Sequence, residues 1–226
     1  MQKNLYEIRR ADAPPRLDGR LDAPEWLNAE SLEIGWFHPA GSAHRPQTLV
    51  RVLYTAEALH VAFRVKDRFV RAVRTHYQDP VWKDSCVEFF VQPKSDKGYF
   101  NFETNCLGAM LLSYVEDPAR TPAGLARATP VPAELASHIS IYHSLKGPII
   151  QEMTAATTWT VQYSVPFALF ERYVGPLGKV AGQYWRGNFY KCAEDNSHPH
   201  WASWQPLAEE VNFHRPDLFG SLRLSP

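Results

Sequence analysis

The sequence predicts an all-β protein: an antiparallel β-sandwich of the jelly-roll or immunoglobulin-like type, with one or two short helices. Apolar and polar residues alternate with a period of two in many short segments, as in strands that bury one face. The 18 prolines and 12 glycines fall mainly between these segments, where turns are expected. No βαβ alternation, GxGxxG motif or P-loop motif is present, which disfavours a Rossmann or barrel enzyme. The expected core therefore lies between two antiparallel sheets.

Several segments carry the strand pattern. Strands are expected at residues 49–54, 59–66, 87–92, 100–105, 159–165 and 187–192. Residues 93–98 have the composition of a hairpin loop between two of them. Short helices are expected at residues 24–29 and 166–170, because each begins with a proline after a capping residue. The stretch 116–134, rich in Pro, Ala and Arg and without a clear period, is interpreted as a loop or an insertion, which either lines a binding site or is a solvated excursion.

Composition limits the possible partners. The 226 residues, 45% hydrophobic and 13% aromatic, fit one domain over residues 1–226 with a sizeable core. Lys+Arg and Asp+Glu both total 24, so the formal charge is zero, and neither nucleic acid nor a membrane surface is expected as a partner. No apolar run approaches the ~20 residues of a spanning helix, and residues 1–7 lack a signal-peptide core. We expect an intracellular protein or one whose signal has been removed.

The cysteines give no sign of a disulfide framework. Cys86, Cys106 and Cys192 are an odd number, lie far apart and show no CxxC spacing. This pattern does not indicate a zinc knuckle either. We expect all three to be reduced and buried as small hydrophobic residues.

Trp82 and Glu88 are the most informative pair of residues. Trp82 stands just before an apolar strand, and Glu88 lies within it. A pyranose ring packs its C–H bonds on an indole face, and its hydroxyls donate hydrogen bonds to a carboxylate. The pair therefore suits sugar recognition. The alternatives are a tryptophan packed in the core and a solvated glutamate on the outer face of a sheet.

Further polar residues could extend this pair into a patch. Asn101, Glu103 and Asn105 lie on one face of the next expected strand. If that strand pairs with the Glu88 strand through the 93–98 loop, these side chains could together read sugar hydroxyls. An ordinary polar outer face is the alternative. Asn188 and Lys191, on a later strand, are weaker candidates for the same role.

Short motifs follow one another in order over nearly the whole chain. They are residues 17–22 (LDGRLD) with Trp26, then 50–54 (VRVLY), 59–67 (LHVAFRVKD), 82–91 (WKDSCVEFFV), 165–167 (VPF) and 213–224 (FHRPDLFGSLRL). With these motifs the chain resembles the family 9 carbohydrate-binding modules, in particular the stand-alone family 9-like domains. The resemblance implies a non-catalytic β-sandwich that binds carbohydrate, often the reducing ends of plant polysaccharides such as xylan or cellulose, in carbohydrate catabolism. It also implies an extracytoplasmic location if a signal was removed.

The resemblance also implies site residues. Trp82 matches the first of two aromatic residues that clamp a saccharide, and Glu88 matches the acidic hydrogen-bonding position. The second tryptophan of the family is absent, and Phe213 or His214 stands in its place. We expect Trp204 or the nearby Trp201 to wall either the site or the core. The family also binds structural calcium, whose ligands the sequence does not match residue by residue.

Other hypotheses remain open at this point. Residues 198–204 are interpreted as a loop. Within it His198 and His200, with His214 as a third donor, form an HxH arrangement that suits a transition metal, although a solvated or stacked cluster is the commoner outcome. Glu88 and Glu103 could form the carboxylate pair of a glycoside hydrolase, ~5 to 9 Å apart. A structural or protein-interaction sandwich with a decayed sugar site is the third alternative.

Overall fold

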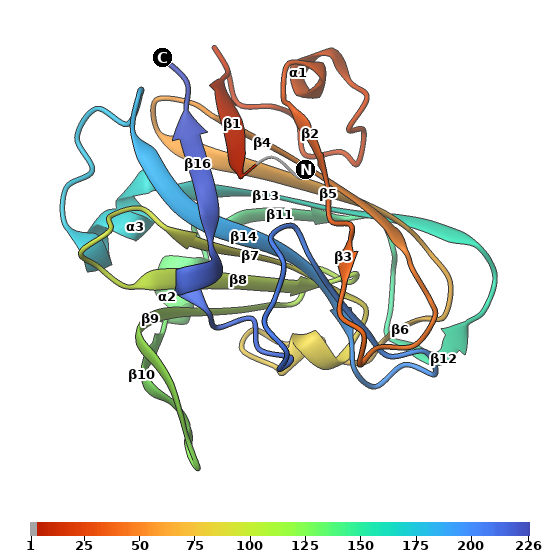
Figure 1. Ribbon diagram of the computed structural model, residues 1–226. Helices are drawn as coiled ribbons and strands as arrows, with labels where there is room; N and C mark the ends of the chain where they lie inside the picture. Colours follow the sequence, from red (N-terminus) through yellow and green to blue (C-terminus); the bar gives the residue numbers. More distant parts are fainter. Residues whose placement is uncertain (1–3) are drawn as a thin grey trace.

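Two β-sheets packed face to face make up the protein, and one strand joins them (Figure 1). This computed structural model describes residues 4–226, so the first three residues considered above for a signal peptide lie outside the described residues. Strand β1 (Leu5–Arg10) pairs first with β16 (Gly220–Leu224) and then, through its last two residues, with β4 (Gln47–Tyr54). Both pairings are parallel, whereas the remaining ladders of the described residues are antiparallel, as predicted.

The first sheet, called the site sheet below, has the strand order β10–β9–β8–β7–β14–β16, with β15 added to β14 and β3 added to β15. Its strands besides β16 are β3 (Trp36–Phe37), β7 (Cys86–Gln92), β8 (Tyr99–Asn105), β9 (Met110–Thr121), β10 (Gly124–Pro130), β14 (Tyr184–Ala193) and β15 (His200–Ser203). The back sheet has the order β1–β4–β5–β13–β11, with β2 on β4. Its other strands are β2 (Ser31–Glu33), β5 (Ala58–Asp67), β11 (Ser140–His143) and β13 (Thr157–Pro166).

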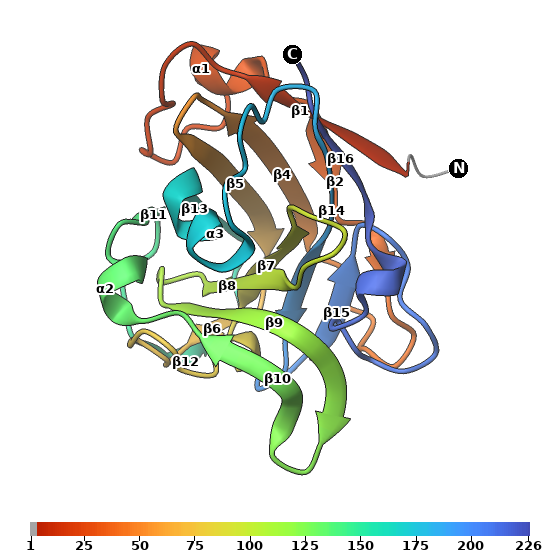
Figure 2. The ribbon, with the colours of Figure 1, turned by 90° about the vertical axis from the view of Figure 1, so that its left-hand side faces the viewer.

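Short helices and a small ribbon close the ends of the sandwich. They are α1 (Pro24–Leu27), α2 (Ala133–Ala136), α3 (Phe167–Val174), the 3-10 turns η1 (Val81–Lys83) and η2 (Pro216–Leu218), and the pair β6 (Val70–Ala72) and β12 (Ile149–Met153). The two expected helices are α1 and α3, and α2 adds one further turn. Helix α3 turns a buried face inward, where Phe170 packs edge-on against Phe100 with ring centroids 5.0 Å apart. It lies in front of the sheets in Figure 2.

Aromatic side chains fill the space between the sheets. Phe89 and Phe189 are cross-strand partners on β7 and β14, and their rings stack with centroids 4.5 Å apart. Phe63 of the back sheet meets Phe189 edge-on at 6.3 Å. Fully buried aromatic rings contribute about 3–5 kcal/mol each when truncation to alanine is the measure. The predicted sandwich with its core between two sheets is confirmed.

The outer face of the site sheet is also buried, which the sequence did not predict. Phe90 and Tyr190 project from this face, and the C-terminal segment 205–219 covers them. Phe213 of that segment stacks on Tyr190, with centroids 4.1 Å apart and planes 10° apart. The Tyr190 hydroxyl also donates a hydrogen bond to the Phe213 carbonyl oxygen, 3.0 Å away. These strands therefore have apolar contacts on both faces, where one solvated face was expected.

Two sequence interpretations were wrong. Residues 116–134 are not a loop: they continue β9, form β10 and lead into α2, and the hairpin projects from the sandwich (green in Figure 1). Much of this hairpin is exposed and its register shifts near Leu125 and Arg127, so no strict alternation of apolar residues marks it. The segment around His198 and Trp204 is not a loop throughout either, because it contains β15.

A buried polar cluster crosses the core. The Lys191 ammonium lies 3.6 Å from Asp67 Oδ2 and donates to His200 Nε2 at 2.8 Å, while His44 Nε2 lies 2.7 Å from Asp67 Oδ1. Burial alone would raise the pKa of Asp67, but the Lys191 charge and the His44 hydrogen bond outweigh it and lower that pKa to about 2. Burial, with the Lys191 charge, lowers the pKa of His200 to about 3, so this imidazole is a neutral acceptor at neutral pH.

We predict that Lys191→Met lowers the free energy of unfolding by about 3 kcal/mol or more, because it leaves the Asp67 carboxylate buried without its cation. The double variant Lys191→Met with Asp67→Asn should recover part of this loss, since no buried charge then remains. Denaturant unfolding followed by circular dichroism measures both. Equal losses in the single and double variants would contradict the assigned ion pair.

Candidate functional site

A cavity of about 320 Å³ lies on the covered outer face of the site sheet. Its floor comes from β7 and β8, and its walls come from η1, the β9–β10 hairpin, β15 and the C-terminal segment. The lining side chains include Trp82, Glu88, Phe90, Asn101, Glu103, Leu111, Ser113, Arg120, Leu125, Cys192, Glu194, Trp201, Asn212, Phe213 and His214. This volume is at the lower end of the roughly 300–1,000 Å³ of ligand pockets.

Two carboxyl groups lie side by side on the floor. Glu88 and Glu103 are direct cross-strand partners on β7 and β8, and both project to the outer face. They are only 2% and 4% exposed. The Asn101 amide donates to Glu103 Oε1 at 2.8 Å, and the Cys192 thiol donates to Glu88 Oε1 at 3.1 Å. The strand alternation that separates Glu88 from the core residues Val87 and Phe89 thus places it in the cavity rather than in solvent.

Both carboxyl groups favour their protonated forms. Burial raises the pKa of Glu103 to about 8, even though the Asn101 hydrogen bond and the Arg120 charge lower it. Burial also raises the pKa of Glu88 well above its ordinary value, and the neighbouring Cys192 and Glu103 add to the effect. The floor therefore offers oxygen acceptors and, at neutral pH, carboxylic acid donors.

Two indole rings wall the cavity. Trp82 belongs to η1, which precedes β7, and its ring is half-buried. Trp201 lies on β15 opposite Cys192, and its indole nitrogen donates to Glu194 Oε1 at 3.1 Å. Arg120 and Leu125 reach the cavity from the β9–β10 hairpin. The cavity thus combines flat apolar walls with a polar floor.

Phe213 and His214 form another part of the lining. One face of the Phe213 ring is taken by Tyr190, as described above. His214 Nδ1 and the Tyr99 hydroxyl are hydrogen-bonded at 2.7 Å, and the imidazole centroid lies 5.0 Å from that of Phe90. Burial, together with the Arg120 charge, lowers the pKa of His214 to about 3. This imidazole is therefore neutral at neutral pH.

The structure brings together six of the eight residues that the sequence indicated. They are Trp82, Glu88, Asn101, Glu103, Phe213 and His214. Asn188 and Trp204 were predicted to lie in the site, and neither lines the cavity. Asn188 is fully buried and bonds the backbone of Gln205, and Trp204 is 2% exposed in the core, where its ring meets Phe189 at 6.0 Å.

Sequence reasoning missed part of the lining. Arg120 and Leu125 line the cavity from residues 116–134, which the sequence did not identify as a hairpin. Cys192 is free and buried, as predicted, but it alternates with the inward-facing Lys191 and so points to the outer face and the cavity. For Trp201, the sequence did not decide between the site and the core. Recognition of β15 would have placed it beside Cys192, its cross-strand partner.

The HxH segment is engaged in other contacts. His200 Nε2 accepts from Lys191, and its Nδ1 donates to the His198 carbonyl oxygen at 2.9 Å. The His198 ring stacks on Phe69 with centroids 3.7 Å apart. His214 lies in the cavity instead, paired with Tyr99. The geometry therefore does not bring the three histidines together as metal ligands.

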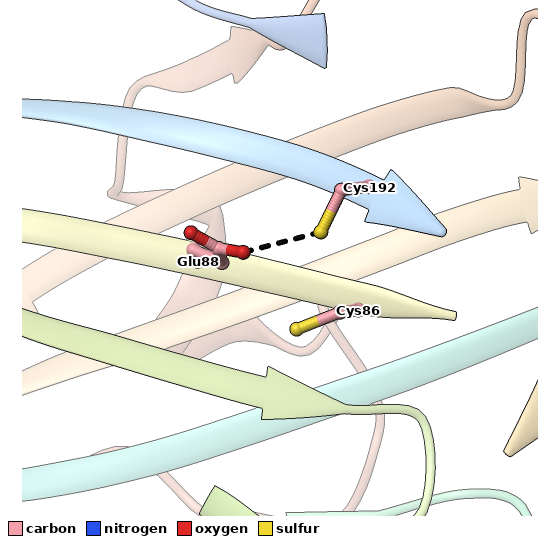
Figure 3. A group of neighbouring side chains, drawn as sticks. All are labelled: Cys86, Glu88 and Cys192. Carbon is pink, nitrogen blue, oxygen red and sulfur yellow. Dashed lines mark hydrogen bonds between the residues drawn. The ribbon is translucent and has the colours of Figure 1, made fainter. Parts of the chain in front are cut away.

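Among residues 4–226, one group of three His, Cys, Asp or Glu side chains is close enough to share a metal ion: Cys86, Glu88 and Cys192 (Figure 3). Two thiols do not suit calcium, which takes six to eight oxygen ligands. Asp84, another buried acid, instead accepts hydrogen bonds from Arg74 at 2.8 Å and from Asn105 at 2.9 Å. Structural calcium stays a prediction.

Comparison with known proteins agrees with this fold. The model of carbohydrate-binding family 9 matches residues 24–224. The chain belongs to this family. Members of family 9 are non-catalytic carbohydrate-binding modules, and the prediction that the protein is not an enzyme is confirmed. None of the curated proteins compared with the chain matches it.

Solved structures show the same architecture. A protein of Bacteroides uniformis, provisionally described as carbohydrate-binding, is 27% identical with a TM-score of 0.83, over 98% of this chain and 99% of its own. A family 9 module of Caldicellulosiruptor kristjanssonii in complex with glucose is 15% identical with a TM-score of 0.62, over 97% of this chain and 95% of its own. Its complex with cellotriose gives the same identity and TM-score over 98% and 93%. Every helix within residues 4–226 is too short or too polar to cross a membrane.

We predict that Glu103 lowers the free energy of unfolding as the pH rises from about 4.5 to about 8. The folded protein keeps the Glu103 proton over this window while the unfolded chain loses it, which costs up to ~1.4 kcal/mol per pH unit. Below about 6.5 the lowered pKa values of His200 and His214 act in the opposite direction, so the Glu103 contribution is the difference in slope between the parent protein and Glu103→Gln. Glu103→Gln should gain stability relative to the parent protein as the pH rises, because the amide does not titrate. Melting temperatures across this range measure the slope. The exposed Glu116→Gln serves as control, and an unchanged slope in Glu103→Gln would contradict the assignment.

Proposed function

We propose that the cavity on the site sheet binds a saccharide, with Trp82 and Trp201 as stacking walls and the Glu88 and Glu103 carboxyl groups as hydroxyl readers. The observation that carries the proposal is the meeting of half-buried indole rings with two buried carboxyl groups in one cavity. A pyranose needs this combination, because its ring faces are apolar and its rim is polar.

The polar floor suits the hydroxyl groups of a sugar. Each protonated carboxyl group offers one donor and one acceptor, so it matches a hydroxyl, which is also both. Asn101 holds Glu103 by a hydrogen bond and accepts one from the Ser113 backbone N–H at 2.7 Å, which fixes its own orientation. Preorganised partners of this kind reduce the entropy lost when a ligand binds.

The ligand that fits best is the end of a glucose- or xylose-based chain. The cavity has the volume of a small pocket rather than of a long groove, so it suits one or two sugar units at a chain terminus. Glucose and cellotriose are bound by the Caldicellulosiruptor kristjanssonii module, which has the same fold. Reducing ends of plant polysaccharides such as cellulose or xylan are therefore the first ligands to test.

The two carboxyl groups are arranged for binding rather than for glycoside cleavage. A glycosidase places its acid and its base or nucleophile on opposite sides of the scissile bond. Glu88 and Glu103 instead project from adjacent strands, on one face of one sheet. They therefore approach a sugar from the same side, in agreement with the non-catalytic family.

We predict that Trp82→Ala weakens saccharide binding about 10- to 100-fold, equivalent to ~1.4–2.8 kcal/mol, because it removes a stacking wall. Trp201→Ala should have a similar effect. Isothermal titration with glucose, cellotriose and xylo-oligosaccharides measures the affinities. Circular dichroism and melting temperature should stay near those of the parent protein, since both rings are half-buried.

Tyr184→Ala is the matched control, because Tyr184 is 63% exposed and lies outside the cavity. Its affinity should equal that of the parent protein. A parent protein that binds the sugars while Trp82→Ala and Trp201→Ala bind them equally well would place the saccharide elsewhere. If the parent protein binds none of the glycans, a module that interacts with another protein would instead be favoured.

A further inference from the structure

Two thiols and a carboxyl group converge beneath the cavity. Cys86 and Cys192 are direct cross-strand partners on β7 and β14, and Glu88 follows Cys86 by two residues on the same face. Their sulfur and oxygen atoms all lie within 4.8 Å of one another. Figure 3 shows the three side chains projecting from the two neighbouring strands toward a common region. All three side chains are buried, and Glu88 and Cys192 also line the cavity.

The hydrogen bonds at this place are weak, because a thiol takes part in each of them. Within residues 4–226, the Glu88 carboxyl group receives a hydrogen bond from the Cys192 thiol and from no other group. The Cys86 thiol lies 3.6 Å from the Val87 carbonyl oxygen and has a side-chain hydrogen bond with Cys192, whose sulfur is also 3.4 Å from the Trp82 carbonyl oxygen. Little hydrogen bonding is therefore lost when a cation replaces these contacts.

We propose that Cys86, Glu88 and Cys192 bind a zinc ion, with a fourth coordination position facing the cavity. Thiolate and carboxylate donors in a three-ligand set with one open position are an established zinc geometry. On binding, the two thiols and the carboxyl group release their protons, and the anions are neutralised by the divalent ion. The Lys191 ammonium, on the opposite face of β14, contributes further positive charge nearby.

The donor set selects among metals. Two soft thiolates favour zinc over calcium or magnesium, which require oxygen ligands. Zinc–sulfur and zinc–oxygen bonds of about 2.3 and 2.1 Å separate tetrahedral ligand atoms by roughly 3.5–3.8 Å. The ligand atoms lie within 4.8 Å of one another, so small side-chain rotations bring them to these separations. Burial raises the pKa of the Cys86 thiol to about 12, and a bound cation reverses this effect.

The test uses the full chain, stripped of metal by a chelator and kept reduced. Titration with zinc should show one ion per chain, and titration with cobalt(II) should produce the absorption of thiolate-to-metal charge transfer. Cys86→Ala and Cys192→Ala should each lose more affinity than the roughly 10- to 100-fold that outer-shell partners contribute. Cys106→Ala is the matched control, because Cys106 is equally buried but lies outside the group.

Three results would overturn the proposal. The first is an absence of zinc binding, and the second is an equal loss of affinity in Cys106→Ala. The third is a disulfide between Cys86 and Cys192 in protein isolated without reductant, shown by thiol counting and peptide mapping. Because the readout is metal binding, it is independent of saccharide binding: failure here leaves the sugar site standing, and failure of the sugar site leaves this test unchanged.

Discussion

The central constraint of this protein is that strands β7, β8 and β14 are covered on both faces. Their inner faces carry the aromatic core, and their outer faces lie beneath the C-terminal segment 205–219. Every outward side chain of these strands must therefore find a partner or a cavity. Phe90 and Tyr190 find aromatic neighbours, whereas Glu88 and Glu103 face the cavity. The chemistry of the site follows from this burial, because it raises the pKa of both carboxyl groups.

The covering segment shapes the site as well as burying it. The stack of Phe213 on Tyr190 fixes its central part, and the pair of His214 with Tyr99 fixes the next residue. Both contacts hold residues of the cavity lining in place. One face of the Phe213 ring is therefore used for packing on Tyr190. The two indole rings of the lining, Trp82 on η1 and Trp201 on β15, are the stacking surfaces that we propose for the sugar.

Local sequence patterns predicted most of the sandwich but not its outer cover. The period of two located β5, β7, β8 and β13, and it placed Glu88, Asn101 and Glu103 on one face. The burial of that face depends on a segment more than 100 residues later in the chain, and no local pattern reports such packing. The exposed β9–β10 hairpin lacks a buried side, so it was read as a loop. Trp201 lies on β15, whereas Trp204 follows the end of that strand and packs in the core, which only recognition of the strand and its end could show.

The most direct measurement is a crystal structure of the protein grown with saturating cellotriose. The account predicts a sugar ring in the cavity, packed on an indole ring of Trp82 or Trp201, with hydroxyls within hydrogen-bond distance of Glu88 and Glu103. A cavity that remains without sugar while the saccharide occupies another face of the sandwich would contradict the central claim.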